Sequence, residues 1–315
     1  MLKLILRRLV FAVLALFATS VIVFTATEVL PGDVAQAILG QQATPELLDN
    51  LRQQLGLHRP PVERYFSWLA GFVNGDLGRS LASKADVLQT VKPRLINTLT
   101  LAAYAALVAV PLSIALGILC AAYPNRAIDR FFSTLSVFLV SIPEFVVGLI
   151  LVLVFAVQLR WFPAVVVRLN WNEPLSLLWQ LMLPMLTLLC TIVAHTVRMT
   201  RAALLDVLSM PYIEMAMLKG MPRWRIILRH GLPNAIGPIA SVVALNLGYL
   251  ISGVALVEVV FAFPGLGRLM IDSIAYRDLP LIQATAMIMC VMFIFFNLVA
   301  DILAVLFKPR GTALR

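Results

Sequence analysis

Charged side chains are scarce in this sequence. Lys, Arg, Asp and Glu make up 13% of the 315 residues, whereas 61% are hydrophobic. Soluble globular proteins carry about 25% charged and about 45–50% apolar residues, so this composition excludes an ordinary soluble domain. We therefore expect a protein that lies in a lipid bilayer.

Motifs for catalysis and for nucleotide binding are also missing. A phosphate-binding loop needs Gly-Lys-Ser/Thr, and the sequence contains no Gly-Lys dipeptide; it also contains no HExxH and no GxSxG. The histidines lie far apart, and the cysteines lie in apolar runs without the spacing of a metal site or a disulfide. These residues are His58, His195, His230, Cys120, Cys190 and Cys290. We expect no catalytic site, no bound metal and no cofactor in this chain.

Long apolar runs dominate what is present. A transmembrane helix needs about 20 apolar residues to cross about 30 Å of hydrocarbon. Five runs free of Asp, Glu, Lys and Arg meet this length, and a sixth, 131–159, is interrupted only by Glu144. The five uninterrupted runs are 9–27, 95–123, 174–197, 232–257 and 279–300. We predict an all-α polytopic membrane protein with six transmembrane helices.

Lys and Arg residues are unevenly distributed between the two sides of the membrane if the chain crosses it six times. With the N-terminus inside, the inner segments hold most of them, and the short outer loops hold few. The positive-inside rule therefore places both termini in the cytoplasm. This asymmetry explains the net charge of +9 without nucleic acid as a partner. We expect the first run to stay as a permanent helix, because it is too long for a typical signal peptide and Leu-Pro-Gly-Asp follows it at 30–33.

Residues 31–94 form the one large extramembrane segment, which the predicted orientation places outside the cytoplasm. Thr44 or Pro45 can start a helix through Leu55, and Pro60-Pro61 opens a second helix to about Val73. Neither helix is long enough to build a core of its own. Two interpretations are open: a surface cap, or a docking floor for a protein that delivers substrate.

Residues 212–234, bounded by Pro211 and Pro233, form a basic amphipathic insert between two apolar runs. Read as helix with a turn at Gly220-Met221-Pro222, the insert offers an apolar side and a positively charged one. The apolar side comprises Met215, Leu218, Trp224, Ile227 and Leu228, and the charges are Lys219, Arg223, Arg225 and Arg229. Such a helix either docks on another protein or rests on anionic lipid.

Ionisable and polar residues inside the spans are the remaining candidates for a function. Glu144 follows a proline that can kink the third span, and it either lines a path through the membrane or bonds a neighbouring helix. Asn246 and Ser252 lie in the fifth span with two glycines, where they line the path or permit close helix packing. We expect packing or interfacial placement for His195. Three acidic residues near span ends are expected to be reached by water or headgroups: Glu28, Glu258 and Asp301.

An ordered series of motifs resembles a known family along nearly the whole chain. Glu214, Ala216 and Gly220, followed by Leu232-Pro233, fit the loop pattern E-A-A-x3-G-x9-I-x-L-P, although Met215 and His230 depart from it. Further matching segments lie at 30–33, 75–78, 198–201, 261–268, 277–280 and 308–310. The chain is similar to the DppB/OppB type of inner-membrane permease subunit in binding-protein-dependent ABC importers, the dipeptide, oligopeptide and nickel group.

This resemblance implies a coupling loop at 211–233 that docks on a separate ATPase. The implied coupling residues are Tyr212, Glu214, Ala216, Lys219, Gly220, Arg223 and Arg225. It implies a fifth span that helps to line the pore, so Asn246 and Ser252 join Glu144 of the third span as candidate path residues. The implied partners are a homologous second permease, two ATP-binding-cassette subunits that bind ATP and Mg²⁺, an extracytoplasmic solute-binding protein and the lipid bilayer.

The same resemblance places the chain in the bacterial inner membrane, and the apolar runs divide it into four regions. These are the N-terminus and first span at 1–30, the extracytoplasmic segment at 31–94, a five-helix core with the loop at 95–308, and a cytoplasmic tail at 309–315. The implied cargo is a di- or oligopeptide, with nickel, metal chelates, glutathione or another small solute as the alternative. A secondary transporter is disfavoured because no clear internal repeat is visible, and a purely structural membrane scaffold is a weaker alternative.

Overall fold

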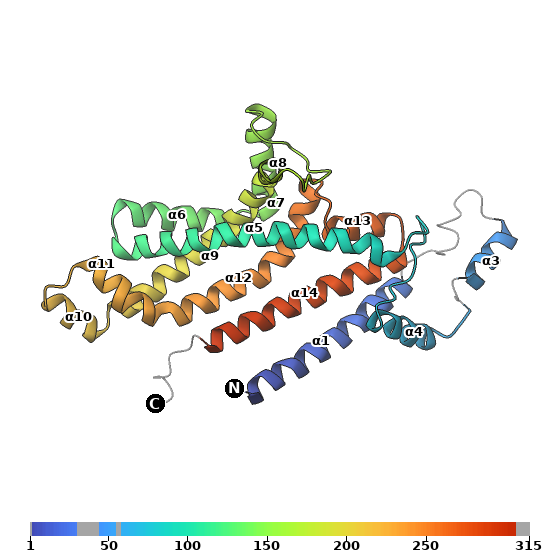
Figure 1. Ribbon diagram of the computed structural model, residues 1–315, viewed down its shortest axis with the longest axis horizontal. Helices are drawn as coiled ribbons and strands as arrows, with labels where there is room; N and C mark the ends of the chain where they lie inside the picture. Colours follow the sequence, from blue (N-terminus) through green and yellow to red (C-terminus); the bar gives the residue numbers. More distant parts are fainter. Residues whose placement is uncertain (1, 30–43, 55–57, 307–315) are drawn as a thin grey trace. The chain divides into compact units, whose positions relative to one another are not determined.

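The computed structural model describes residues 2–29, 44–54 and 58–306 and contains helices but no β-strand in these ranges (Figure 1). The segment 30–33, the start of the segment 31–94, Leu55, and the tail with the motif at 308–310 lie outside the described residues. The helices are α1 (Leu2–Val29), α3 (Pro45–Gln54), α4 (Pro61–Val73), α5 (Val87–Ala122), α6 (Ala127–Ser141), α7 (Glu144–Leu151), the π-helix η2 (Val152–Gln158), α8 (Pro174–Gln180), α9 (Met182–Leu208), α10 (Pro211–Leu218), α11 (Arg223–Ile226), the π-helix η3 (Ile227–Gly231), α12 (Leu232–Val260), α13 (Leu266–Ala275) and α14 (Leu279–Leu306).

Five described helices are long and apolar enough to cross a membrane. They are Leu6–Val29, Val87–Ala122, Met182–Leu208, Arg223–Val260 and Leu279–Val299. The pair Ala127–Ser141 and Glu144–Gln158 meets the same test together, and counting it as one span gives up to six. The predicted all-α polytopic membrane protein is confirmed.

The third span is broken where the sequence predicted a kink. Its two helices are bent by 105° at the junction. Ile142 is extended, with φ −98° and ψ 130°, and Pro143 precedes the first residue of α7. A proline disfavours helical backbone at the preceding residue, and it has no N–H to donate to the helix before it. The chain therefore leaves one helix at Ser141 and starts another at Glu144.

The predicted fourth span, 174–197, has the wrong boundaries. The first residues of the predicted span form the separate short helix α8. The helix of membrane length is α9, which starts at Met182 and runs on to Leu208. Pro184 explains the break, because a proline removes the bond to the carbonyl four residues earlier and clashes with it. That carbonyl belongs to Gln180, the last residue of α8.

Two compact units divide the chain. The first comprises Met1–Thr98 and Pro264–Met292, and the second comprises Leu99–Phe263 and Phe293–Arg315. In the second unit α9 packs against α6, α7 and α12. Its core is built from fully buried aliphatic and aromatic side chains, among them Leu183, Leu188, Val254 and Phe261. This packing fixes the helices that carry the candidate path residues.

Helix α4 of the first unit packs on α1. Tyr65 is buried, its hydroxyl lies 2.8 Å from the hydroxyl of Ser20, and its ring meets Phe24 edge to face at 5.4 Å. The predicted helix from Pro61 to Val73 is confirmed, and the helix predicted from Pro45 is found as α3. Prolines at the first helical turn set both N-terminal boundaries.

Candidate functional site

The 211–233 loop contains two helical pieces separated by a turn. Helix α10 ends before Gly220, which adopts φ +76°, and Pro222 then precedes α11. The turn predicted at Gly220-Met221-Pro222 is therefore confirmed. Glycine accepts a positive φ readily, and Pro222 has no N–H to continue α10, so both residues favour the turn. Helices α11, η3 and α12 follow one another without a gap and carry the charges at 223–229 into the fifth span.

Isoleucine side chains attach this loop to the rest of the second unit. Ile213, Ile226 and Ile227 are buried, and Ile227 packs in a cluster with Leu204 and Ala235. The five residues of the predicted apolar side do not form one buried face, because only Ile227 among them is buried. The other four are exposed: Met215, Leu218, Trp224 and Leu228. The loop thus presents apolar side chains that the described chain does not cover.

The seven predicted coupling residues lie on both sides of the Gly220 turn. Tyr212, Glu214, Lys219, Gly220, Arg223 and Arg225 are exposed, and Ala216 is half-buried. Trp224 meets the ring of Tyr123 at the end of α5, edge to face at 6.1 Å. Figure 1 shows α10 and α11 at the end of this unit where α5 connects to α6. The exposed polar residues of the loop therefore lie on short helices that are packed against the rest of the second unit.

A cavity of about 600 Å³ lies between α7, α9 and α12. The three predicted path residues all line it: Glu144 from α7, and Asn246 and Ser252 from α12. His195, for which packing or interfacial placement was predicted, also lines this cavity from α9 and is exposed. The amide of Asn246 donates a 2.8 Å hydrogen bond to the buried hydroxyl of Thr196. Apart from a few polar groups, the walls are aliphatic, as expected for a binding cavity.

Two glycines of α12 allow close contacts with other side chains. A Cβ at Gly253 would lie 2.7 and 2.8 Å from the carboxylate oxygens of Glu144, so this carboxylate rests directly on the α12 backbone. A Cβ at Gly248 would lie 3.0 Å from Oδ1 of Asn297 on α14. Gly248 is therefore a packing position, and it does not line the α7–α9–α12 cavity.

The acidic residues predicted near span ends have different environments. Glu258 is fully buried, so the prediction that water or headgroups reach it is wrong. It lies in the last turns of α12, whose end is covered by the core around Phe261. Glu28 forms an ion pair with Arg64, and Asp301 is half-buried.

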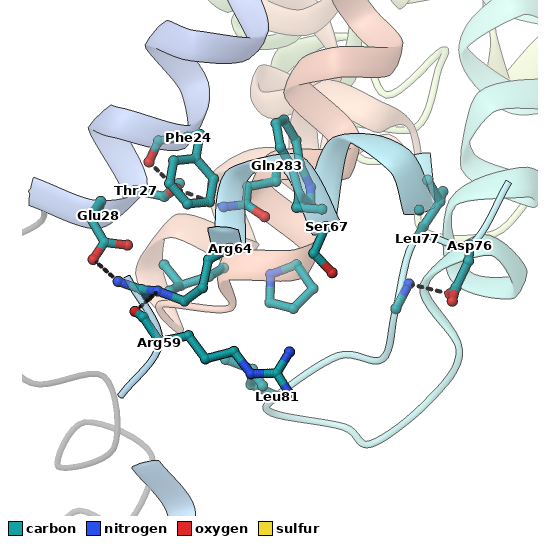
Figure 2. Close-up of a pocket in the computed structure, with 15 residues that line it drawn as sticks. Phe24, Thr27, Glu28, Arg59, Arg64, Ser67, Asp76, Leu77, Leu81 and Gln283 are labelled. Carbon is teal, nitrogen blue, oxygen red and sulfur yellow. Dashed lines mark hydrogen bonds and ion pairs between the residues drawn. The ribbon is translucent and has the colours of Figure 1, made fainter. Parts of the chain in front are cut away.

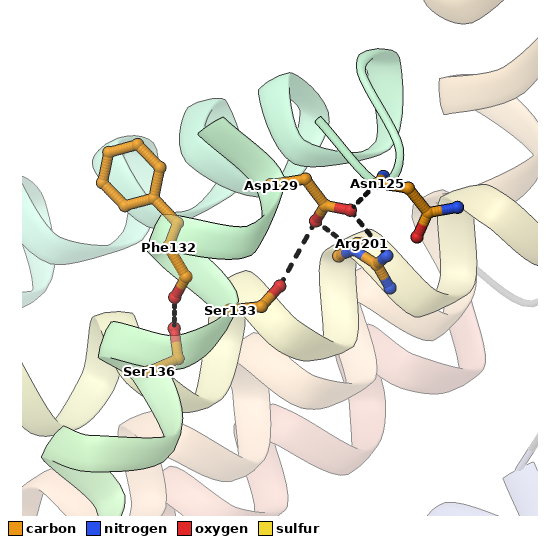
Figure 3. Close-up of polar contacts among 6 residues, drawn as sticks. All are labelled: Asn125, Asp129, Phe132, Ser133, Ser136 and Arg201. Carbon is orange, nitrogen blue, oxygen red and sulfur yellow. Dashed lines mark hydrogen bonds and ion pairs between the residues drawn. The ribbon is translucent and has the colours of Figure 1, made fainter. Parts of the chain in front are cut away.

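An ion pair that the sequence did not predict joins α6 to α9 (Figure 3). Nε and Nη2 of Arg201 donate to the two carboxylate oxygens of Asp129 at 2.5 and 2.8 Å. The same carboxylate accepts bonds from the backbone N–H of Asn125 and the hydroxyl of Ser133. Asn125 has φ +61°, so the carboxylate also fixes the strained turn before α6.

A second cavity, of about 370 Å³, lies in the first unit beside α1 and α4 (Figure 2). The ion pair of Arg64 and Glu28 lies on its wall, and Gln283 donates to the hydroxyl of Thr27 at 2.8 Å. Arg59 lies at its edge, and its guanidinium has no partner among the described residues. Both open interpretations of the segment 31–94 are compatible with this cavity.

Comparison with protein families assigns almost the whole chain. Residues 113–312 match the family described as binding-protein-dependent transport system inner membrane component, and residues 1–102 match its N-terminal membrane component. The chain belongs to this family. It is therefore a permease subunit of a binding-protein-dependent ABC importer and a multi-pass membrane protein, and its family is the membrane component of such importers, distinct from the ATPase.

Individual relatives match over nearly their full length. The glutathione transport system permease protein GsiC of Escherichia coli (strain K12) is 38% identical over 309 residues, which cover 98% of each chain. GsiC of Shigella dysenteriae serotype 1 has the same identity and coverage, and GsiC of Shigella boydii serotype 4 is 37% identical. The family resemblance read from the loop and the scattered motifs is thus confirmed. The individual coupling and path residues stay predictions.

Sequence reasoning missed the Asp129–Arg201 pair and the position of His195. Arg201 lies in the motif at 198–201, and Asp129 lies just before the third apolar run, so both were visible as charges beside spans. Nothing local indicated that they pair, because 72 residues separate them.

Proposed function

We propose that this permease subunit forms one half of a translocation path for di- and oligopeptides, with a homologous second permease forming the other half. The observation that carries the proposal is the α7–α9–α12 cavity, which Glu144, Asn246 and Ser252 all line. Three residues selected from two different spans meet at one cavity large enough for a small solute. Its aliphatic walls suit varied side chains, and its few polar groups suit the ends and the backbone of a peptide.

The 211–233 loop is the coupling element of this proposal. Its exposed residues would contact an ATPase subunit, while the buried isoleucines carry the motion to the rest of the second unit. These exposed residues are Tyr212, Glu214, Lys219, Arg223 and Arg225. Since α11 and η3 continue into α12, a displacement of the loop acts directly on the helix that lines the cavity. Docking drives transport only if the ATPase binds the loop differently in its open and closed states.

The complete importer contains two permeases, two ATP-binding-cassette subunits and an extracytoplasmic solute-binding protein. ATP and Mg²⁺ bind to the ATPase subunits. We place the chain in the bacterial inner membrane with both termini cytoplasmic, following the Lys and Arg distribution. The four regions then keep the bounds predicted from the sequence: 1–30, 31–94, 95–308 with the loop at 211–233, and 309–315.

Glutathione is the second candidate cargo. Relatives with 38% identity over 98% of the chain are named glutathione transport system permeases. Glutathione is itself peptide-like, with amide bonds, a free ammonium group and carboxylates, so the same cavity chemistry serves both. Nickel and metal chelates remain alternatives within the same architecture.

The test is ATP-driven uptake by the complete importer in proteoliposomes. Its solute-binding protein is loaded in turn with a dipeptide, a tripeptide, glutathione or a nickel chelate, and each uptake rate is compared with the rate without ATP. ATP-dependent uptake of peptides is the expected result. Uptake of glutathione alone moves the cargo to the second candidate, and uptake of only the chelate contradicts a peptide path.

A further inference from the structure

Glu144 contributes the one carboxylate to the α7–α9–α12 cavity. No Lys or Arg is among the residues that line it, and His195 and Tyr249 are its other titratable groups. Throughout the described chain, no residue forms a hydrogen bond or an ion pair with the Glu144 side chain. A half-buried carboxylate that lacks a cation is costly, so it normally has a function.

The position of this carboxylate is set by two local features. The Pro143 break makes Glu144 the first residue of α7, where the helix N-terminus stabilises a negative charge. The absence of a side chain at Gly253 leaves the space that the carboxylate occupies, since a Cβ there would lie 2.7 Å from one of its oxygens. The carboxylate is thus held at the cavity wall, against the α12 backbone at Gly253.

A compact cation carried by the cargo is the natural partner of such a group. A single carboxylate is a poor site for a divalent metal, which needs several ligands, and the described residues contain no group of three His, Cys, Asp or Glu that could hold one. An ammonium group needs only one charged acceptor and some polar neighbours. Asn246 and Ser252 supply those neighbours in the same cavity.

We propose that Glu144 is a specificity-determining residue that receives the free ammonium group of the cargo, while the aliphatic walls accept its side chains. The inference rests on the proposed function, because it assumes that the cargo passes through this cavity. It assigns the substrate class as solutes with a free amine and disfavours purely anionic ones. Gly253 is the positioning residue that keeps the carboxylate in place.

The charge of the cavity can be measured directly with a thiol at Ser252. In the full complex, Cys120, Cys190 and Cys290 are replaced by alanine, and Ser252→Cys is labelled with a cationic or an anionic methanethiosulfonate of similar size. Each rate is divided by the rate of the same reagent with free cysteine. We expect about a tenfold preference for the cationic reagent, because a charge in a partly buried site acts more strongly than one in bulk water.

Variants of Glu144 and of Gly253, the residue against which its carboxylate lies, give the decisive comparison. Glu144→Gln keeps the shape and removes the charge, so the preference should fall to about one; Gly253→Ala should lower it by displacing the carboxylate. Glu173→Gln, which removes an exposed carboxylate before α8, is the matched control and should change nothing. An unchanged preference in Glu144→Gln, or no labelling at Ser252→Cys by either reagent, overturns the inference.

Uptake separates this inference from the proposed function. With peptide-loaded binding protein, Glu144→Gln should lower the maximal uptake rate severalfold, and Glu144→Asp should recover part of it. If the unmutated importer moves peptides and Glu144→Gln moves them equally well, the ammonium site is refuted and the path stands. If the unmutated importer moves no peptide at all, the proposed function fails irrespective of the labelling result.

Discussion

Removing the Asp129 carboxylate is the strongest test of the ion pair that connects α6 to α9. The carboxylate is almost fully buried, with 3% of the side chain exposed, and it accepts two bonds from Arg201 at 2.5 and 2.8 Å. It also accepts the N–H of Asn125 at 2.8 Å and the hydroxyl of Ser133 at 3.2 Å. Asp129→Ala leaves all four donors without this acceptor.

The expected loss follows from the burial of the two partners. Breaking a buried ion pair by removing one partner costs about 3–5 kcal/mol, because the other charge stays buried without compensation. Arg201 is 27% exposed, so water recovers part of this cost, and we expect about 3 kcal/mol for Asp129→Ala. Asp129→Asn should cost nearly as much, since its amide N–H groups would face donors. Ser133→Ala should cost about 1 kcal/mol.

The assay is unfolding of the purified chain in mixed micelles of rising SDS content, followed by tryptophan fluorescence. The matched control is Asp272→Ala, which breaks the 3.6 Å pair with Arg268 in α13, where both side chains are at least 36% exposed. Such exposed pairs contribute about 0–1 kcal/mol. The reasoning is refuted if Asp129→Ala lowers the unfolding free energy no more than Asp272→Ala does.

Two further predictions use the same titration. Gly117→Ala would bring a Cβ to 2.6 Å from Cβ of Thr200, so we expect a loss of about 1–3 kcal/mol from overpacking; an unchanged midpoint would contradict this close approach of α5 and α9. Asp278→Asn replaces a buried carboxylate that accepts hydrogen bonds from the hydroxyl of Ser80 at 2.5 Å and the N–H of Leu81 at 3.2 Å. We expect the unfolding free energy to fall by about 2 kcal/mol. A loss no larger than that of Ser83→Ala would show that these bonds contribute little.

Local signals in the sequence predicted much of the helical structure. Helix α4 starts at Pro61 and ends at Val73 as expected, because a proline and a short polar turn mark its ends. The spans were found because crossing a bilayer requires length and apolarity, which are properties of each run by itself. The family was found because its motifs are short and keep their order along the chain.

Contacts between distant segments could not be predicted in this way. The 105° break at Pro143 depends on what α7 packs against, since a proline alone permits angles from a mild kink to a full turn. The burial of Glu258 and the pairing of Asp129 with Arg201 depend on neighbours far away in the sequence. Glu144 was found from the third span and Asn246 and Ser252 from the fifth, but their meeting at one cavity required the packing of α7 and α12.

Stimulation of ATP hydrolysis by loaded solute-binding protein tests the central claim, that the 211–233 loop couples an ATPase to this permease. Gly220 and Gly75 both adopt a positive φ, of 76° and 82°, with nothing within 4 Å of an added Cβ, so valine strains the backbone equally at the two sites. In the reconstituted importer, Gly220→Val should lose most of the stimulation and Gly75→Val should keep it. Equal stimulation in the two variants would contradict the coupling role of the loop.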